Sequence, residues 1–202
     1  MDLHVDSRNT ARYTLRPFRK RDAETLLEAV RHSMPDLYPF LPWATHGYNQ
    51  VNATRFIRDA THAWREQRAF NFAIRDAEGA GPHLGNVFVL YVSKSSRTGE
   101  IGYWINSGNT SQGIATEVTA RIVQVAFEEL GLHRVVLRIA VGNRPSERVA
   151  EKLGFTREGV LREELEVHGT WLDHTAYSML EREYVSAEND IAAFVEYQSK
   201  AI

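Results

Sequence analysis

The chain has no cysteine among its 202 residues. Disulfide bonds, thiolate metal sites and a cysteine nucleophile are therefore excluded from its chemistry, and we predict no metal cofactor. The absence of cysteine fits a reducing compartment, and we predict a cytoplasmic protein.

Long apolar runs and an excess of charge of one sign are also missing. No uncharged apolar segment is long enough to cross a bilayer, and the first ten residues have neither the basic nor the apolar region of a secretory signal. The 24 basic and 26 acidic residues leave a formal net charge of -2. No general attraction to nucleic acid or to an anionic membrane follows from that balance, and we expect neither as a partner.

The first half of the chain reads as a strand, two helices and three more strands. Residues 13–18 alternate as a short strand near Pro17, and amphipathic helices are predicted over 23–33 and 51–67. Between these helices, prolines among aromatic residues predict an irregular loop over 34–47. The three following strands are expected as an antiparallel meander over 69–76, 83–93 and 99–106.

The second half predicts a helix from residue 114, a strand over 133–143, a short helix over 144–154 and a hairpin of 155–169 with 170–180. This mixed order predicts an α/β (α+β) fold around one mostly antiparallel sheet, with a parallel crossover within 99–143. We expect a single domain over 1–202, with a core of about 13–184. The helical tail over 185–202 packs either on this domain or on a second copy, which leaves a homodimer open.

A glycine turn at the mouth of the middle helix raises a functional question. The stretch "NTSQGIATEVTARIVQVAFEEL" places Gly113 directly before an apolar-periodic helix. It is either an ordinary helix start or an anion site, because the first N–H groups of a helix have no partner within it. The glycine patterns of a dinucleotide fold and of a P-loop are both absent.

The surrounding motifs decide in favour of the anion site. "TSQGIATE" resembles the pyrophosphate loop of the GCN5-related N-acetyltransferases, in which Gly113 and Ala115 match fixed positions of Arg/Gln-x-x-Gly-x-Gly/Ala. It is similar to the loop of the RimJ/RimL-type ribosomal-protein branch, although Thr110 and Ser111 replace an Arg and a Gly. "GEIGYWIN", "NRPSERVAEKLGF" and the closing hairpin resemble further family segments in the same order, over about residues 13–184.

The resemblance implies the acetyltransferase fold, a seven-stranded sheet whose central parallel strands splay apart around the pantetheine of acetyl-CoA. It also implies which residues bind this co-substrate: Trp104, Ile105 and Asn106 on a strand edge, Gln112, Gly113, Ile114, Ala115 and Thr116 in the loop, and Asn143. The proline-aromatic loop ending in "LPWA" is similar to the family's substrate loop, so Tyr38, Phe40 and Trp43 are expected to wall the acceptor pocket or to fill the core.

Four residues are candidates for the chemistry. The resemblance implies that Ser146 donates a proton to the leaving thiolate and that Asn143 holds the pantetheine or a reacting group. The alternative for both residues is a structural role at the start of a helix. An α-amine needs only modest help to lose its proton, which a carboxylate acting through water supplies. Glu164 and Glu166 are the candidates, and a solvated strand face is the alternative for each.

The predicted activity is transfer of an acetyl group from acetyl-CoA to a protein or peptide N-terminal amine. Two alternatives stay open: a small amine as the acceptor, such as a polyamine, an amino acid or an aminoglycoside, and an acyl-CoA-binding module without turnover. The arginine missing at Thr110 motivates the second alternative.

Overall fold

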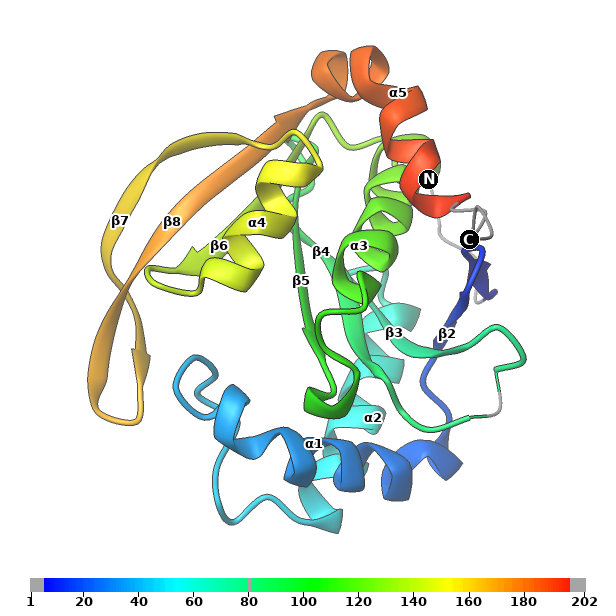
Figure 1. Ribbon diagram of the computed structural model, residues 1–202, viewed down its shortest axis with the longest axis vertical. Coiled ribbons are helices and arrows are strands. Elements are labelled where there is room, and N and C mark those ends of the chain that lie inside the picture. The colour runs from blue at the N-terminus through cyan, green and yellow to red at the C-terminus, as the bar shows by residue number, and fades with distance from the viewer. Residues whose placement is uncertain (1–5, 80, 197–202) are drawn as a thin grey trace.

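The computed structural model describes residues 6–79 and 81–196. One sheet of eight strands has the order β1-β2-β3-β4-β5-β6-β8-β7 (Figure 1). The strands are β1 (Arg8–Asn9), β2 (Tyr13–Pro17), β3 (Ala69–Asp76), β4 (Gly85–Ser93), β5 (Thr98–Ile105), β6 (Arg134–Ala140), β7 (Thr156–Val167) and β8 (Thr170–Leu180).

The predicted fold class is confirmed, with one more strand than expected. All neighbouring strands are antiparallel except β5 and β6, which are parallel as the crossover required. The additional strand is β1, whose two residues pair with Thr14 and Leu15 of β2. Two residues are too short to show an alternating pattern, so the sequence alone gave no sign of this strand.

The helices are α1 (Ala23–Leu37), α2 (Gln50–Arg65), α3 (Ile114–Gln124), α4 (Arg144–Lys152) and α5 (Glu181–Val195). A wider π-helical turn over Val125–Glu129 continues α3. The start of the predicted 34–47 loop is helical instead, because α1 continues through Pro35 to Leu37. Met34 and Leu37 are buried in the core, and this packing outweighs the backbone hydrogen bond that Pro35 cannot make.

Two apolar clusters hold the layers together. The larger joins one face of the sheet to α3, α4 and α5 and includes the α5 residues Tyr184, Ile191 and Val195. The smaller joins α1 and α2 to Phe18, Ala73 and Trp104. The described part of the predicted tail therefore packs on its own chain, while residues 197–202 of that tail lie outside the described residues.

A buried ionic group lies beside the smaller cluster. Asp22 accepts hydrogen bonds from both terminal nitrogens of Arg16, at 2.7 and 2.8 Å, and from Arg75 at 3.2 Å. His83 is buried nearby between the rings of Phe18 and Trp104, and neither of its ring nitrogens has a partner within the described residues. Burial, reinforced by the charge of Arg75, lowers the pKa of His83 to about 3. This histidine is therefore neutral at physiological pH.

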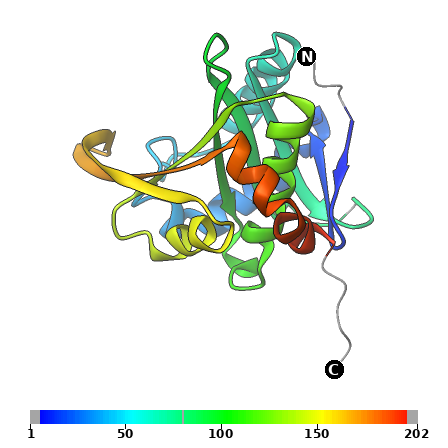
Figure 2. The ribbon, with the colours of Figure 1, turned by 90° about the horizontal axis from the view of Figure 1, so that it is seen from above.

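The β7–β8 hairpin curves away from the rest of the molecule in both views (Figure 1, Figure 2). Its turn is not isolated, because the ring of His168 stacks on Tyr38 with a centroid distance of 4.0 Å. No helix within the described residues has the length and apolar character that crossing a membrane requires.

Candidate active site

The sheet is split between β5 and β6. These strands pair only through Thr98, Gly99 and Glu100 against Arg134, Val135 and Val136. Beyond those pairs β5 continues to Ile105 and β6 to Ala140, and the two strands diverge (Figure 1). The splayed parallel pair that the family resemblance implied is therefore present, and two cavities lie along it.

The first cavity, which we call the α3 cavity, has a volume of about 580 Å³ and lies at the N-terminus of α3. Gly113 precedes α3 in the left-handed conformation, with φ of +79°, and supplies no side-chain cap. A residue without a Cβ adopts this conformation without strain and leaves the helix N–H groups open to a ligand. Gly113 is exposed, so the mouth of the helix is accessible.

The side chains around the α3 cavity favour an anionic ligand. Arg148 and Lys152 of α4 line it, and Asp36 is its one acidic lining residue in the described part of the chain. Their charge adds to the partial positive charge at the N-terminus of α3. Most of the residues predicted to bind the co-substrate also line this cavity: Trp104, Ile105, Gly113, Ile114, Ala115, Thr116 and Asn143.

Two residues predicted for the co-substrate, Asn106 and Gln112, are not among those that line this cavity, although their chain neighbours are. Asn106 donates from Nδ2 to the carbonyl of His83, at 3.1 Å, and accepts from the N–H of Gly108, at 3.2 Å, so its side chain holds the turn after β5. Gln112 does not line the cavity, and its carbonyl accepts a hydrogen bond from Arg12.

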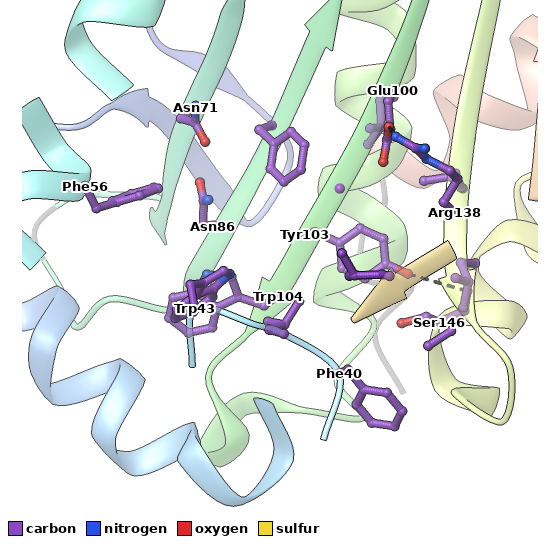
Figure 3. A pocket seen from close by; sticks show the side chains of 18 of the residues that line it. Phe40, Trp43, Phe56, Asn71, Asn86, Glu100, Tyr103, Trp104, Arg138 and Ser146 are labelled. Atoms are coloured by element: carbon purple, nitrogen blue, oxygen red, sulfur yellow. Dashed lines mark hydrogen bonds and ion pairs between the residues drawn. The ribbon is translucent and has the colours of Figure 1, made fainter. Parts of the chain in front are cut away.

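The second cavity, the α2 cavity, has a volume of about 660 Å³. Its floor is the sheet, with Asn71 on β3, Asn86 and Phe88 on β4 and Gly102 on β5, while Phe56 of α2 forms part of a wall (Figure 3). A Cβ on Gly102 would lie 2.3 Å from Cζ of Phe88, so the Phe88 ring occupies the space that a side chain would need. This glycine keeps the floor flat.

A buried amide in the α2 cavity lacks a partner. Asn86 is 4% exposed, and its Oδ1 makes no hydrogen bond with any described residue. In Figure 3, Asn86 lies below Asn71 and above Trp43, with Phe56 to its left. Since an unpaired buried acceptor is costly, this amide is suited to receive a hydrogen bond from a ligand.

Two carboxylates lie on the side of the α2 cavity next to the split. Arg138 of β6 bonds Glu100 of β5, with a 3.1 Å contact from Nε, and Glu164 of β7, at 2.5 Å from Nη1. The hydrogen bond with Glu100 makes the largest contribution to raising the pKa of Arg138 above its ordinary value. The permanently charged Arg138 thus holds both carboxylates at the opening between the strands.

The two carboxylates predicted as candidate bases, Glu164 and Glu166, lie in different surroundings. Glu164 lines the α2 cavity, whereas Glu166 is exposed and lines neither cavity. β7 is irregular between Leu161 and Leu165, and Glu163 within that segment has a positive φ of 51°. The backbone N–H of Glu163 donates to Asp173 across the hairpin, at 2.8 Å.

The two cavities meet at a small group of residues that line both: Phe40, Leu41, Tyr103, Trp104, Asn143 and Ser146. Asn143 caps α4 by accepting from the N–H of Ser146 at 3.3 Å, and the Tyr103 hydroxyl points to the Ser146 carbonyl at 3.5 Å. Burial raises the pKa of Tyr103 to about 12, so the phenol keeps its proton. A group arriving from one cavity can react here with a group arriving from the other.

The predicted acceptor residues lie in different places. Phe40 is at the junction and Trp43 lines the α2 cavity, but Tyr38 lines neither cavity, because its ring is stacked with His46 and His168.

The sequence analysis missed Glu100, Arg138, Tyr103 and Asn86. Strand alternation offered one sign, since Glu100 and Trp104 lie on one face of β5 with Gly102. The contact of Arg138 with β5 and β7 depends on tertiary structure. No cluster of metal-ligating residues is found in residues 6–79 and 81–196.

Comparisons with known proteins identify the family of the chain. The profile described as "Acetyltransferase (GNAT) domain" matches residues 12–156. The chain is 34% identical over 172 residues to "Putative ribosomal N-acetyltransferase YdaF" of Bacillus subtilis, covering 85% of this chain and 92% of the relative.

Solved structures of acetyltransferases have the same fold as this chain. Mycobacterium smegmatis RimJ in complex with CoA-disulfide is 26% identical with a TM-score of 0.76, covering 91% of this chain and 94% of that one. A crystal structure named "Probable acetyltransferase" has a TM-score of 0.79 at 29% identity, covering 91% and 98%. The chain belongs to the GNAT acetyltransferase family, as an N-acetyltransferase whose acyl donor is acetyl-CoA.

Proposed function

We propose that the protein acetylates the N-terminal α-amino group of a protein or peptide, with acetyl-CoA in the α3 cavity and the acceptor in the α2 cavity. The observation that carries this proposal is the meeting of the two cavities at Tyr103, Trp104 and Ser146. The ribosomal acceptor in the name of the Bacillus subtilis relative supports a protein N-terminus.

The α3 cavity suits the diphosphate part of the co-substrate. The N–H groups at the start of α3 and the cations of Arg148 and Lys152 attract phosphate, and Gly113 removes the obstacle of a side chain. Placing the diphosphate at one end of the split directs the thioester arm along β5 toward Ser146. Holding the thioester there makes attack by a neighbouring amine effectively intramolecular.

The transfer requires one proton to leave the amine and one to reach sulfur. The amine nitrogen attacks the thioester carbon, a C–N bond forms, and the C–S bond breaks as the thiolate departs. Roughly a tenth of free α-amines are neutral at pH 7. Glu164, which reaches the α2 cavity, takes the amine proton through a water molecule and releases it to solvent. The Ser146 hydroxyl donates a proton to the thiolate and regains one from solvent, so both groups return to their starting states. Tyr103 holds the Ser146 backbone at the junction.

A small cationic amine is the second candidate acceptor. The α2 cavity contains the carboxylates of Asp59, Glu100 and Glu164 against the cations of Arg55 and Arg138. This excess of negative charge complements a polyamine as well as the terminus of a peptide.

A matched acceptor panel separates these candidates. The first acceptors are peptides with a free N-terminus. The second are the same peptides with an N-formyl group and an internal lysine, so that the lysine is the remaining amine. The third are free polyamines and amino acids. We expect thiol release only with the free N-termini. Turnover with formylated peptides would move the acceptor to a lysine side chain, and turnover with free amines alone would favour the second candidate.

A further inference from the structure

The chain segment before β2 lies against the first turn of α3. The Thr10 hydroxyl donates to Oε1 of Glu117 at 2.5 Å, and the backbone N–H of Arg12 donates to the same oxygen at 3.2 Å. Arg12 Nε donates to the other oxygen at 2.8 Å, and Nη2 forms an ion pair with it at 2.6 Å. Both carboxylate oxygens of Glu117 are therefore held by a segment more than a hundred positions away in the sequence.

The same arginine reaches the glycine turn. Arg12 Nη1 donates to the carbonyl of Gln112 at 3.2 Å, and Nη2 lies 3.4 Å from the position that a Cβ on Gly113 would take. One guanidinium group thus connects the carbonyl before Gly113 to the carboxylate in the first turn of the helix, and it lies beside Gly113 itself. A planar group with several N–H donors is suited to hold two segments at once.

Glu117 creates an electrostatic problem that Arg12 solves. Glu117 is 2% exposed and lies in the first turn of α3. A negative charge at this position competes with a bound diphosphate for the positive end of the helix. A buried carboxylate without a partner would repel the phosphates and be costly in itself. The cation of Arg12 offsets that charge from behind the loop, because Arg12 does not line the α3 cavity.

We propose that Arg12 is the positioning residue of the diphosphate loop. It takes over, from a distant segment, the task of the arginine that the loop motif lacks at Thr110: it fixes the Gln112–Gly113 backbone and neutralises Glu117, so that the N–H groups of α3 bind the coenzyme diphosphate. This inference rests on the proposed location of acetyl-CoA in the α3 cavity.

The chain offers a matched control at the other end of the same helical segment. Arg8 Nη2 pairs with Glu129 at 2.7 Å, in the π-helical turn that follows α3. Arg8 and Arg12 both fasten the N-terminal segment to this helix, but only Arg12 touches the loop. A variant of Arg8 or of Arg12 weakens the attachment of the N-terminal segment. The Arg12 variant in addition removes the contact with the loop.

The experiment compares acetyl-CoA with S-acetylpantetheine, which carries the same thioester without the diphosphate, at one fixed acceptor. We expect Arg12→Gln to raise the KM for acetyl-CoA about tenfold, the size of one charge-assisted hydrogen bond. The KM for S-acetylpantetheine and kcat should change less than about twofold, since neither depends on the diphosphate. Arg12→Lys, which keeps the charge and loses the fork, should give an intermediate KM.

A double variant tests the charge argument. In Arg12→Gln/Glu117→Gln no buried charge is left unpaired, so part of the acetyl-CoA affinity should return. Arg8→Gln should leave both KM values unchanged, and calorimetry with CoA alone should reproduce the affinities without any acceptor.

Three results would overturn the proposal: equal losses for both thioesters, an equal effect of Arg8→Gln, or no effect of Arg12→Gln. If CoA affinity fails to respond to a carboxylate introduced at Gly113, the location of the coenzyme itself is wrong, which is a separate failure.

Discussion

The α3 cavity and the α2 cavity share a junction but are built differently. The α3 cavity depends on backbone geometry: a left-handed glycine, the N-terminus of one helix and a strand edge. The α2 cavity depends on side chains from α2, the sheet and the β7–β8 hairpin, such as Phe56, Asn86 and Glu164. A site formed by backbone groups suits one constant ligand. In a site formed by side chains, amino-acid substitutions change which ligand binds. On the proposed assignment, the first cavity binds the acyl donor and the second selects the acceptor.

The largest expected effect is on the proposed removal of a proton from the amine in the α2 cavity. Glu164→Gln keeps the shape of the side chain and removes the proposed base, so kcat at pH 7 should fall about 100-fold. The loss should shrink as pH rises above about 8, where an α-amine is neutral without help. Steady-state kinetics across pH measure both effects. Glu166→Gln is the matched control, and an equal loss in that variant would remove Glu164 from its role.

The next effect isolates the α3 cavity. Gly113→Asp places a carboxylate against the diphosphate and should raise the Kd for acetyl-CoA about 30-fold by like-charge repulsion. Calorimetry measures this affinity. Gly131→Asp is the control, because Gly131 also has a positive φ, 62°, with nothing near its missing Cβ and no part in either cavity. An unchanged affinity for Gly113→Asp would place the coenzyme elsewhere.

A smaller effect isolates the α2 cavity. Gly102→Ala sets a methyl group where the Phe88 ring now lies, so the ring must move and the floor is no longer flat. We expect the KM for the acceptor to rise about fivefold, with the KM for acetyl-CoA within twofold. Initial-rate measurements with each substrate varied in turn check this. A change in the acetyl-CoA constant alone would show that the cavities are wrongly assigned.

The effect that is smallest at neutral pH concerns stability beneath the junction, where His83 packs on Trp104. The pKa of His83 is lowered to about 3 in the folded protein, so between about 6.5 and 3 the unfolded chain binds a proton that the folded chain does not. Stability is therefore lost as pH falls through that window, by up to about 1.4 kcal/mol per unit. His83→Phe should reduce this slope while leaving stability near pH 7.5 little changed, as measured by urea unfolding. An unchanged slope would contradict the buried neutral histidine.

The same difference between the cavities explains what the sequence could predict. The order of the strands and helices along the chain and the glycine turn follow from local patterns, whereas the residues of the α3 cavity were implied by the family resemblance, whose motifs include the short continuous segments Gly113 to Thr116 and Asn143 to Ser146. The family resemblance then added the split between β5 and β6, which no local pattern shows.

The rest depends on contacts between distant segments. Glu100, Arg138 and Glu164 come together from three strands, and Arg12 reaches Gly113 across a hundred residues. Alternation could not separate Glu164 from Glu166, because both occupy one strand and only tertiary packing brings one of them to a cavity. Tyr38 looked like a pocket wall for its aromatic ring, but stacking on His46 and His168 uses that ring.

The short pairing between β5 and β6 has a consequence for the enzyme without its co-substrate. Past Glu100 and Val136, the peptide groups on the facing sides of both strands pair with no strand in the described part of the chain. An extended arm containing amide bonds, such as that of coenzyme A, can provide some of those missing partners. We therefore predict that binding the acyl donor completes the sheet and slows amide hydrogen exchange along both strands.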